Sequence, residues 1–553
     1  MVPAAAADPV SVAIGDFGAW QARSLLLLFL VKIPAGWHML SILFLAPFPE
    51  TFGGSYICAR DDDPANLSLA DWIQTKHPVD QRYPSGFNPC YVYSNAINES
   101  TAANAYNVEK CEKFEFFVDL PTMVTEWSLV CERSVLVSLI QSLYIFGTAI
   151  GGVVTFFSLK IISPKTLIMV GTALQVSAGI AGALQPIFEV HCLLKLLIGL
   201  GTCLMFTAAN QIIVDISTGW RKTVFSVSFE FFWSVGVITL GWLDAAADSW
   251  STLHLTFSIP SIIFILIWSF FPESPRWLIA HGRFDNADNL LKFVANYNGR
   301  DLPEDFTTKK PLIASPGSTI CQKLPKFRVF CLQIMWIGTV VHYYGALYNI
   351  RNVGGPTLPI RTSFAGAAEI IGTVIGLFLL LKSKHKFGTL SLLLLIGGTS
   401  CATSFAIPPN ASGSTSGWTM LGLAIVGRIS VASSLAVMTN GSLELLPGDR
   451  RPTVGLAMVT VARLLLMTAP FLSTLAFYGE SITLTFHGCL ASIAAFGAFG
   501  IFLTAEWRGL QELLSKKVFN PQEEPKSRSS EDDIVVCTYF NPQCEEFITS
   551  ISA

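Results

Sequence analysis

The sequence predicts an all-α integral membrane protein with twelve transmembrane helices in two related halves. Of its 553 residues, 51% are hydrophobic and 14% are charged, and the mean hydropathy is +0.52. A soluble protein of ordinary composition has about 25% charged residues, so lipid must cover much of this surface. About a dozen apolar runs each approach the roughly 20 residues that cross about 30 Å of hydrocarbon.

A repeated spacing divides these runs into two halves. Asp215 ends the fourth run and Glu444 ends the tenth, and each acid is followed by a glycine four residues on and then by a basic pair. Matched halves are typical of membrane transporters that open a midplane site first to one face and then to the other. The repeat therefore predicts two pseudo-symmetric six-helix bundles.

The expected spans follow from the apolar runs in order. They lie near 22–46, 134–157, 165–184, 191–213, 223–243 and 251–271, and then near 328–350, 362–381, 389–407, 417–438, 453–477 and 481–503. The first run is too long for a cleavable signal, contains Arg23 and Lys32, and follows a segment without basic residues. We therefore expect it to stay as the first span.

Basic residues in the short loops predict the orientation. Lys160, Lys165, Arg221, Lys222 and the group Lys382–Lys386 fall on one side of the expected bilayer, which the positive-inside rule makes the cytosolic side. Both termini then face the cytosol. The expected organisation is a cytosolic tail 1–21, a bundle 22–271, a cytosolic linker 272–327, a bundle 328–503 and a cytosolic tail 504–553.

The linker should contain an amphipathic helix. Across Asn286–Tyr297, the apolar residues Leu290, Leu291, Phe293 and Val294 share one stripe at helical spacing. We expect this helix to join the two bundles.

The long loop 47–133 should be extracellular. It contains four cysteines, Cys58, Cys90, Cys111 and Cys131, which suit disulfides in an oxidising compartment but allow three pairings. Glycosylation signals at Asn66 and Asn98 fall in this loop, and a third at Asn410 falls on the same side.

The chain lacks the motifs of nucleotide-driven or catalytic proteins. It has no phosphate-binding loop of the G-x-x-x-x-G-K-[ST] kind, no H-E-x-x-H and no nucleophile elbow. The net charge of −3 gives no basic surface for nucleic acid. We expect no enzyme activity, no cofactor, no metal and no use of ATP, with lipid and a small solute as partners.

Five motifs give the chain a family resemblance. They are Pro272–Leu278 (PESPRWL), Glu126–Cys131 (EWSLVC), Gly36–Leu40 (GWHML), Tyr343–Gly345 (YYG) and Glu444–Pro447 (ELLP). Together they resemble the organic cation/anion/zwitterion transporters of the major facilitator superfamily, over about residues 20–510. PESPR alone is shared with sugar porters, and the long cysteine-bearing first loop favours the organic ion branch.

The resemblance implies a secondary-active or facilitative transporter of the plasma membrane. Such a protein moves a small organic cation, anion or carnitine-like zwitterion through a central cavity by alternating access. Charges within the bilayer are then functional candidates, because each costs about 3 kcal/mol or more unless it is paired or faces water.

Arg463 and Glu369 are the leading candidates for binding substrate. Arg463 lies near the middle of the eleventh span, where the resemblance implies a basic residue in anion and carnitine-type members, and a guanidinium suits a carboxylate. The alternative is an internal ion pair without substrate contact. Glu369 matches a cavity position of cation carriers, so the two residues together favour a zwitterion.

Further charged and aromatic residues are candidates for the same cavity. The charged candidates are Glu230 and Lys32. The aromatic candidates are Trp233, Trp336, Tyr343 and Tyr344, and their rings would suit a quaternary ammonium group. For Lys195 and Arg428 we expect structural pairing, because the family commonly has a basic residue at both places.

The cytosolic loops depart from the family pattern. The resemblance implies an ionic latch with an aspartate and arginines after the second span, but here Lys160 and Pro164 occupy such positions, and Lys382–Lys386 also lacks the acid. Lys165 or Lys384 would replace an arginine. The expected remaining partners are Asp215, Arg221, Glu273, Arg276, Glu444, Arg451 and Glu506. A second hypothesis is therefore a non-transporting relative that acts as a sensor or partner protein.

Overall fold

The computed structural model describes residues 8–47, 56–60, 68–80, 83, 86–93, 108–118, 120–303, 306–309, 326–407, 414–445 and 451–507. Within these ranges, eleven helical segments are long and apolar enough to cross a membrane. They are Ala19–Leu45, Cys131–Ser158, Pro164–Leu184, Phe188–Asp215, Arg221–Asp244, Lys326–Asn352, Leu358–Lys382, Lys386–Ala406, Ser416–Ser442, Thr453–Ala476 and Ser481–Glu506.

The main helices of these segments are as follows. The first half has α2 (Ala19–Leu30), α3 (Lys32–Leu40), α4 (Ile42–Leu45), α7 (Val135–Ser158), α8 (Pro164–Leu184), α9 (Phe188–Asp215) and α10 (Arg221–Asp244). The second half has α15 (Lys326–Tyr348), α16 (Leu358–Lys382), α17 (Lys386–Ala402), α18 (Ser414–Glu444), α19 (Arg451–Leu466), α20 (Ala469–Leu472) and α21 (Glu480–Ile501). Short turns η5 (Asn349–Asn352), η6 (Thr403–Ala406), η7 (Ser473–Tyr478) and η8 (Phe502–Trp507) extend some of them.

The sixth expected span differs from the others. Its apolar helix covers only Trp250–Leu266. It comprises α11 (Trp250–Ser258), the 3-10 turn η3 (Ile259–Ser261) and α12 (Ile262–Leu266), followed by a 3-10 turn η4 (Trp268–Phe270). Pro260 lies at this break, where its missing N–H removes a helical hydrogen bond. The sequence predicted a span near 251–271, and the structure shows an apolar helix that is shorter than the other eleven.

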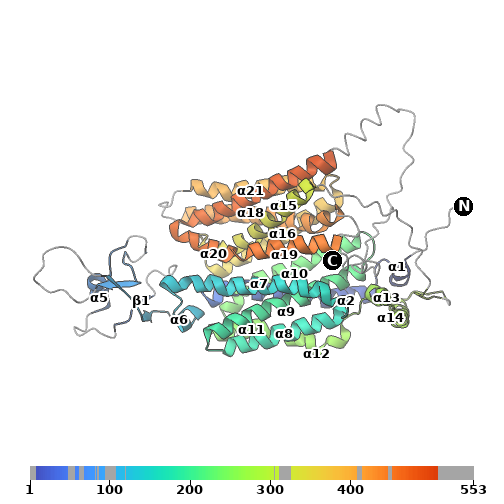
Figure 1. The fold of residues 1–553 in the computed structure, drawn as a ribbon, viewed down its shortest axis with the longest axis horizontal. Coiled ribbons are helices and arrows are strands. Elements are labelled where there is room, and N and C mark those ends of the chain that lie inside the picture. The colour runs from blue at the N-terminus through green and yellow to red at the C-terminus, as the bar shows by residue number, and fades with distance from the viewer. Residues whose placement is uncertain are drawn as a thin grey trace, which may run out of the picture.

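The helices form two bundles that lie against each other along their length. In Figure 1 the helices before residue 271 occupy the lower half and those after residue 326 the upper half. Helix α7 packs on α19, and α10 packs on α16, so these two pairs join the bundles. Gly241 permits the close approach of α10 to α16, because a Cβ at this glycine would lie 2.5 Å from Pro359 Cα.

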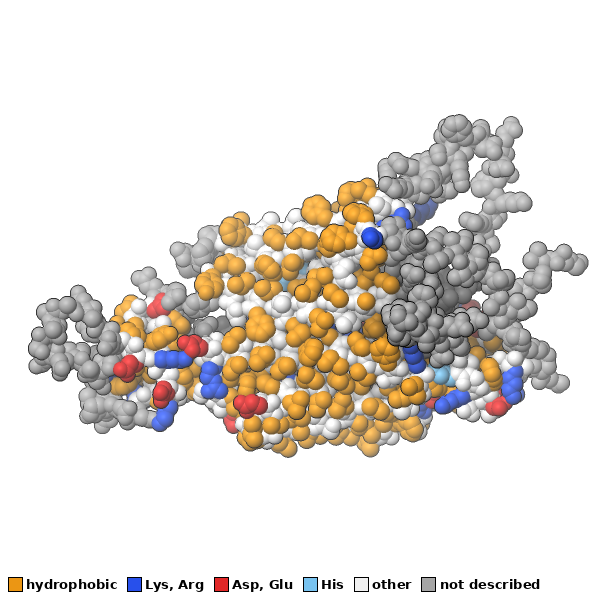
Figure 2. All heavy atoms as spheres, in the orientation of Figure 1, with side chains coloured by type: hydrophobic (Ala, Val, Ile, Leu, Met, Phe, Trp, Pro, Cys, Tyr) orange, Lys and Arg blue, Asp and Glu red, His pale blue; other side chains and the backbone are white. Residues whose placement is uncertain are grey.

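The flanks of the bundles are apolar and their ends are charged. Figure 2 shows hydrophobic side chains over the central part of the visible face, with basic and acidic side chains gathered toward the two ends. Exposed large apolar side chains of the bundles include Leu266, which is 76% exposed, and Phe496, which is 71% exposed. A surface of this kind is covered by hydrocarbon rather than water.

A small cap of strands extends from one end of the bundles. Strand β1 (Tyr56–Cys58) pairs antiparallel with β4 (Phe114–Phe116), and β2 (Tyr91–Tyr93) pairs antiparallel with β3 (Val108–Lys110). The helices α5 (Leu69–Lys76) and α6 (Met123–Trp127) and the 3-10 turn η2 (Cys131–Ser134) belong to the same region. We call this end of the bundles the cap end; it lies to the left in Figure 1.

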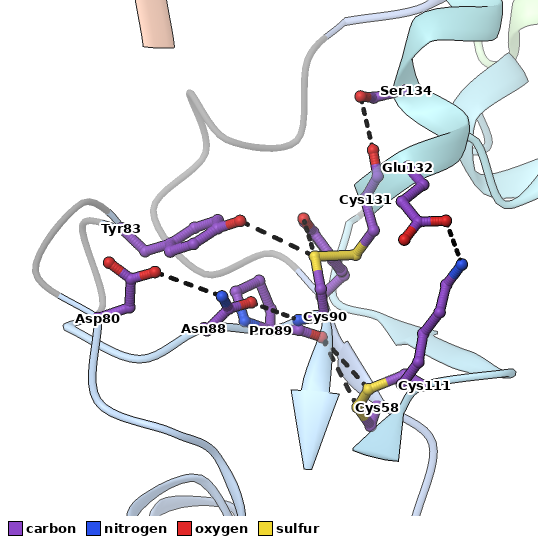
Figure 3. Close-up of a disulfide and its surroundings, with 12 residues drawn as sticks. Cys58, Asp80, Tyr83, Asn88, Pro89, Cys90, Cys111, Cys131, Glu132 and Ser134 are labelled. Carbon is purple, nitrogen blue, oxygen red and sulfur yellow. Dashed lines mark hydrogen bonds and ion pairs between the residues drawn. A yellow bond between two sulfur atoms is a disulfide. The ribbon is translucent and has the colours of Figure 1, made fainter. Parts of the chain in front are cut away.

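Two disulfides tie the cap together. The structure pairs Cys58 with Cys111 and Cys90 with Cys131, which selects one of the three pairings that the sequence left open. Figure 3 shows the second bond, which links Cys90, directly before strand β2, to the turn η2 that leads into α7. The glycosylation candidates Asn66, Asn98 and Asn410 lie outside the described residues.

Short helices gather at the opposite end of the bundles, which we call the linker end. They are α1 (Pro9–Ile14), α13 (Pro275–Ala280) and α14 (Phe284–Tyr297). The expected linker helix is α14, which begins two residues earlier than predicted, and its Leu291 and Val294 are buried as expected. Phe293, from the same predicted stripe, is 52% exposed. Helix α13 was not predicted, although Ser274 caps it and Pro275 opens it.

Candidate functional site

A cavity of about 180 Å³ lies between the two bundles. Helices α3, α9 and α10 line it from one bundle, and α15, α16 and α18 line it from the other. Its lining residues are Lys32, Phe206, Thr207, Asn210, Ser226, Val227, Phe229, Glu230, Tyr343, Glu369, Thr373, Ala432, Leu435, Ala436, Thr439 and Asn440. On α9, α10 and α18 these residues fall in the half of the helix nearer the linker end.

An ion pair from the first bundle forms one wall of the cavity. Lys32 Nζ on α3 lies 2.9 Å from Glu230 Oε1 on α10. Three rings surround the same ammonium group: Nζ is 4.6 Å from the ring centroid of Phe206, 4.6 Å from that of Phe229 and 5.9 Å from that of Trp233. An ammonium group within about 6 Å of an aromatic face is attracted to it. A carboxylate and an aromatic cage thus hold Lys32.

A second ion pair comes from the other bundle. Arg428 Nη2 on α18 donates to Glu369 Oε2 on α16 at 2.7 Å, and Arg428 Nη1 donates to the Tyr343 carbonyl at 2.6 Å. The Tyr343 hydroxyl also donates to Glu369. The side chains of Arg428 and Glu369 are 4% and 1% exposed. This pair is therefore enclosed by protein, and Arg428 has the structural pairing expected of it.

The two carboxylates differ in how much of each is accessible. The Glu230 side chain is 35% exposed, whereas the Glu369 side chain is 1% exposed although it lines the cavity. The predicted contact between Glu369 and substrate stays a prediction. In this conformation Glu230 is the carboxylate that a ligand in the cavity can reach.

Arg463 lies beside the cavity but is not among its lining residues. Its Nη1 atom donates to the Thr148 carbonyl on α7 at 2.9 Å and to Cys203 Sγ on α9 at 3.1 Å. The guanidinium also lies 5.8 Å from the Phe206 ring. Arg463 thus joins α19 to the other bundle, and its predicted role as a carboxylate ligand stays a prediction.

The predicted aromatic residues separate into two groups. Tyr343 lines the cavity, and Trp233 and Tyr344 stand next to it with ring centroids 5.9 Å apart. Trp336 is 8% exposed, packs in the hydrophobic core and is not among the lining residues.

Sequence reasoning missed Phe206 and Phe229, the two rings nearest to the Lys32 ammonium. They are two of 40 phenylalanines, and only the packing of α3 against α9 and α10 distinguishes them.

Hydrogen bonds between the bundles lie on the cap-end side of the cavity. Ser142 Oγ donates to the Met467 carbonyl at 2.7 Å, and Ser138 Oγ donates to the Pro470 carbonyl at 3.0 Å. Gln141 Nε2 donates to the Tyr348 hydroxyl at 2.6 Å. These bonds fasten α7 to the helices of the other bundle and close the space between the bundles on this side.

Lys195 belongs to the interior of the first bundle. It is 2% exposed, and its Nζ donates to Ser41 Oγ at 3.0 Å. It therefore contacts protein rather than the cavity, as the sequence led us to expect. Among the residues that the structure describes, no group of three His, Cys, Asp or Glu side chains is arranged to hold a metal ion.

The first set of expected latch residues meets at the linker end. Asp215 accepts hydrogen bonds from Ser274 Oγ at 2.6 Å and from Gln211 Nε2 at 3.0 Å. Arg276 donates to the Asp215 carbonyl at 3.1 Å and pairs with Asp8 at 2.6 Å. The network thus uses the Asp215 carboxylate as a hydrogen-bond acceptor, while Arg276 pairs with an acid that the sequence analysis did not consider.

Burial and neighbouring groups shift the pKa values of two acids at this end, Asp8 and Glu273. Burial raises the pKa of Asp8, but the Arg276 guanidinium and a hydrogen bond from Ser11 outweigh burial, so the pKa falls below its ordinary value. Burial also raises the pKa of Glu273, and there Ser163 and Lys165 offset the rise only in part. The charge of Lys165 therefore acts on Glu273, and the replacement of a latch arginine by Lys165 or Lys384 stays a prediction. Arg221, another expected latch residue, forms an ion pair with Asp16, with Nη1 at 3.2 Å from Oδ1.

Glu506 lies at the linker end of the second bundle, as Asp215 does in the first. Its carboxylate accepts from the backbone N–H groups of Phe387 at 3.0 Å and Gly388 at 3.4 Å, at the first turn of α17. A helix N-terminus favours an acid because its first N–H groups lack partners within the helix. The side chains of Glu444 and Arg451 lie outside the described part of the chain.

Comparisons with known proteins agree with this architecture. A family model described as "Sugar (and other) transporter" matches residues 83–315. The "Organic cation transporter protein" of Drosophila melanogaster is 26% identical over 514 residues, which cover 88% of this chain and 90% of that protein. The "Organic cation/carnitine transporter 2" of Homo sapiens is 26% identical over 520 residues, with 88% and 90% covered.

A solved structure shows the same fold. The partially occluded inward-open conformation of the xylose transporter XylE from E. coli matches with a TM-score of 0.55 at 13% identity, and covers 88% of this chain and all of that one. The chain therefore has the fold of the major facilitator superfamily and, along most of its length, is similar to proteins named as organic cation and organic cation/carnitine transporters.

Proposed function

We propose that this protein transports small organic ions across the plasma membrane by alternating access, without ATP. The observation that carries the proposal is the cavity between the two bundles, whose walls hold the Lys32–Glu230 ion pair and a set of aromatic rings. Charged groups in the membrane interior are tolerated where they are paired or face a solvated cavity. Relatives named as organic cation and carnitine transporters support the same activity.

We further propose that the cap end faces the extracellular side. The disulfides of the cap suit an oxidising compartment, and basic residues such as Lys160 and Arg221 gather at the opposite end. With this orientation both termini are cytosolic, and the structure represents the state in which the extracellular side is closed by the bonds from Ser138, Gln141 and Ser142.

The comparisons give the non-transporting alternative no support, because the relatives named above are transporters. The reduced latch is compatible with transport, since Asp215 and Glu506 retain hydrogen-bonded positions at the linker end. We accordingly propose transport, rather than catalysis or sensing, as the activity.

Counterflow into proteoliposomes tests the proposal. The purified protein is reconstituted, loaded with unlabelled solute and offered three labelled probes: tetraethylammonium, a trimethylammonium carboxylate and a dicarboxylate. We expect protein-dependent accumulation of at least one of them. Absence of accumulation for every probe, in vesicles shown to contain folded protein, would overturn the proposal.

A cross-link across the cap end tests alternating access itself. The double variant Ser142→Cys/Met467→Cys places two thiols where α7 meets the opposite bundle. A short thiol-reactive cross-linker should stop counterflow in this variant, and a cleavable linker should restore it on reduction. Each single cysteine variant serves as the matched control and should keep its activity after the same treatment.

A further inference from the structure

The Lys32 ammonium already occupies a site with the chemistry of an organic-cation subsite. Glu230 supplies a carboxylate at 2.9 Å, and the Phe206 and Phe229 centroids both lie 4.6 Å from Nζ. A carboxylate beside aromatic faces is what a quaternary ammonium ligand requires. The side chain that fills this site comes from the protein, and only 9% of it is exposed.

Each acidic or basic side chain that lines the cavity has an ion-pair partner. Glu230 is matched by Lys32 in one bundle, and Glu369 is matched by Arg428 in the other. Because the second pair is enclosed, a ligand that enters must act on the first. The occupant of the cavity therefore decides whether Lys32 and Glu230 both keep partners.

A ligand of single charge leaves one of these two groups unpaired. An organic cation that takes the aromatic cage and Glu230 displaces the Lys32 ammonium from its carboxylate. An organic anion that binds Lys32 takes the ammonium away from Glu230. A charge as little exposed as that of Lys32, at 9%, is disfavoured without a partner, because its desolvation is not repaid.

A zwitterion avoids this penalty. Its ammonium group takes the cage and Glu230, while its carboxylate follows the displaced Lys32 ammonium, so both protein charges remain paired. The Lys32 ammonium group ends an unbranched side chain with several rotatable bonds. It can therefore move from the Glu230 carboxylate to the carboxylate of the zwitterion.

We propose that Lys32 is a tethered occupant of the cation subsite and that it sets the preference of the cavity for zwitterions over simple organic cations. The inference deepens the proposed function, on which it rests, by naming the substrate class and the residue that selects it. Removing the Lys32 charge should open the cage to cations and remove the partner of the substrate carboxylate.

Direct binding to the purified protein tests this inference. Tetraethylammonium and a trimethylammonium carboxylate are titrated by calorimetry against the wild type and Lys32→Met, which is one atom shorter, unbranched and uncharged. We expect Lys32→Met to bind tetraethylammonium at least about tenfold more tightly than the wild type and the zwitterion about tenfold more weakly. Lys32→Arg, which keeps the charge, should retain the wild-type preference.

Two further variants keep the test decisive. Lys32→Met/Glu230→Gln removes the carboxylate of the cage, so it should lose the gain for tetraethylammonium. Lys32→Gln replaces Lys32→Met if the methionine variant does not elute as a folded protein on size-exclusion chromatography. If the neutral variant binds both ligands as the wild type does, the inference is wrong, although transport by the wild type would still stand. If no organic ion is bound or carried by any variant, the proposed function fails as well.

Discussion

The two ion pairs at the cavity have the same chemistry but different surroundings. Lys32 and Glu230 lie 2.9 Å apart, and Arg428 and Glu369 lie 2.7 Å apart. The Glu230 side chain is 35% exposed and that of Glu369 is 1% exposed. Distance alone therefore does not distinguish an ion pair that a ligand can open from one that holds the protein together.

Hydrogen bonding explains the difference between the pairs. Glu369 accepts from both Arg428 and the Tyr343 hydroxyl, and Arg428 also donates to the Tyr343 carbonyl, so three groups fix one another. Lys32 contributes a single 2.9 Å contact to Glu230 and is otherwise held by ring faces. A planar guanidinium makes several directed bonds, whereas an ammonium on a flexible stem can change partners.

The largest expected effect comes from breaking the enclosed pair. Arg428→Met leaves the Glu369 carboxylate buried without its partner, and we expect the free energy of unfolding to fall by about 3–5 kcal/mol. Thermal unfolding of the purified protein measures the loss. The double variant Arg428→Met/Glu369→Gln should recover part of it, because no buried charge then remains. An equal loss in Lys32→Met would show that the two pairs do not differ in this way.

The next effect concerns the accessible carboxylate. Glu230→Gln should weaken binding of an ammonium-bearing ligand about tenfold, because the ligand loses a charged partner. The loss of stability should be smaller than in Arg428→Met, since the Glu230 side chain is 35% exposed, although the Lys32 ammonium loses its carboxylate. Calorimetry and thermal unfolding on the same preparation measure both quantities. A large loss of stability with unchanged affinity would reverse the roles assigned to the two pairs.

Arg463 tests whether a third charge belongs to the site. Arg463 bonds across the bundle interface to Thr148 and Cys203. Because these bonds contribute to the balance between the outward-open and inward-open states, we expect Arg463→Gln to slow counterflow about threefold. Ligand affinity should change less than about twofold. Arg463→Lys should show a smaller reduction. Selective loss of affinity for carboxylate ligands, with tetraethylammonium unaffected, would instead establish the predicted ligand role.

The smallest effect is expected at the linker end, far from both pairs. Asp8→Asn removes a half-buried partner of Arg276 and should lower stability by less than about 1 kcal/mol. Because the folded-state pKa of Asp8 lies below its ordinary value of 3.8, its contribution is complete above that pH and is lost only as the pH falls further. The difference in melting temperature between variant and wild type should therefore be the same at about pH 6 and about pH 8. A difference that grew over this range would assign the effect to another group.

Most of the fold was predictable because lipid imposes simple rules. Apolar runs of adequate length gave eleven spans close to their observed positions, and the sixth is shorter than predicted and contains a 3-10 turn at Pro260. Of the predicted site residues, Lys32, Glu230, Glu369 and Tyr343 line the cavity, whereas Trp336 packs in the core. An aromatic residue in a long apolar span carries no local signal of the side it faces.

The sequence by itself determined that ionic side chains are held within apolar helices, since composition and run length define the spans and Lys32, Glu230, Glu369, Arg428 and Arg463 fall inside them. Only the tertiary structure decided which of them pair, because Lys32 meets Glu230 from 198 residues away and Arg428 meets Glu369 from 59 residues away. The packing of helices also decided which pair is enclosed and which faces the cavity. That outcome depends on the contacts of several helices at once, which no single segment of sequence contains.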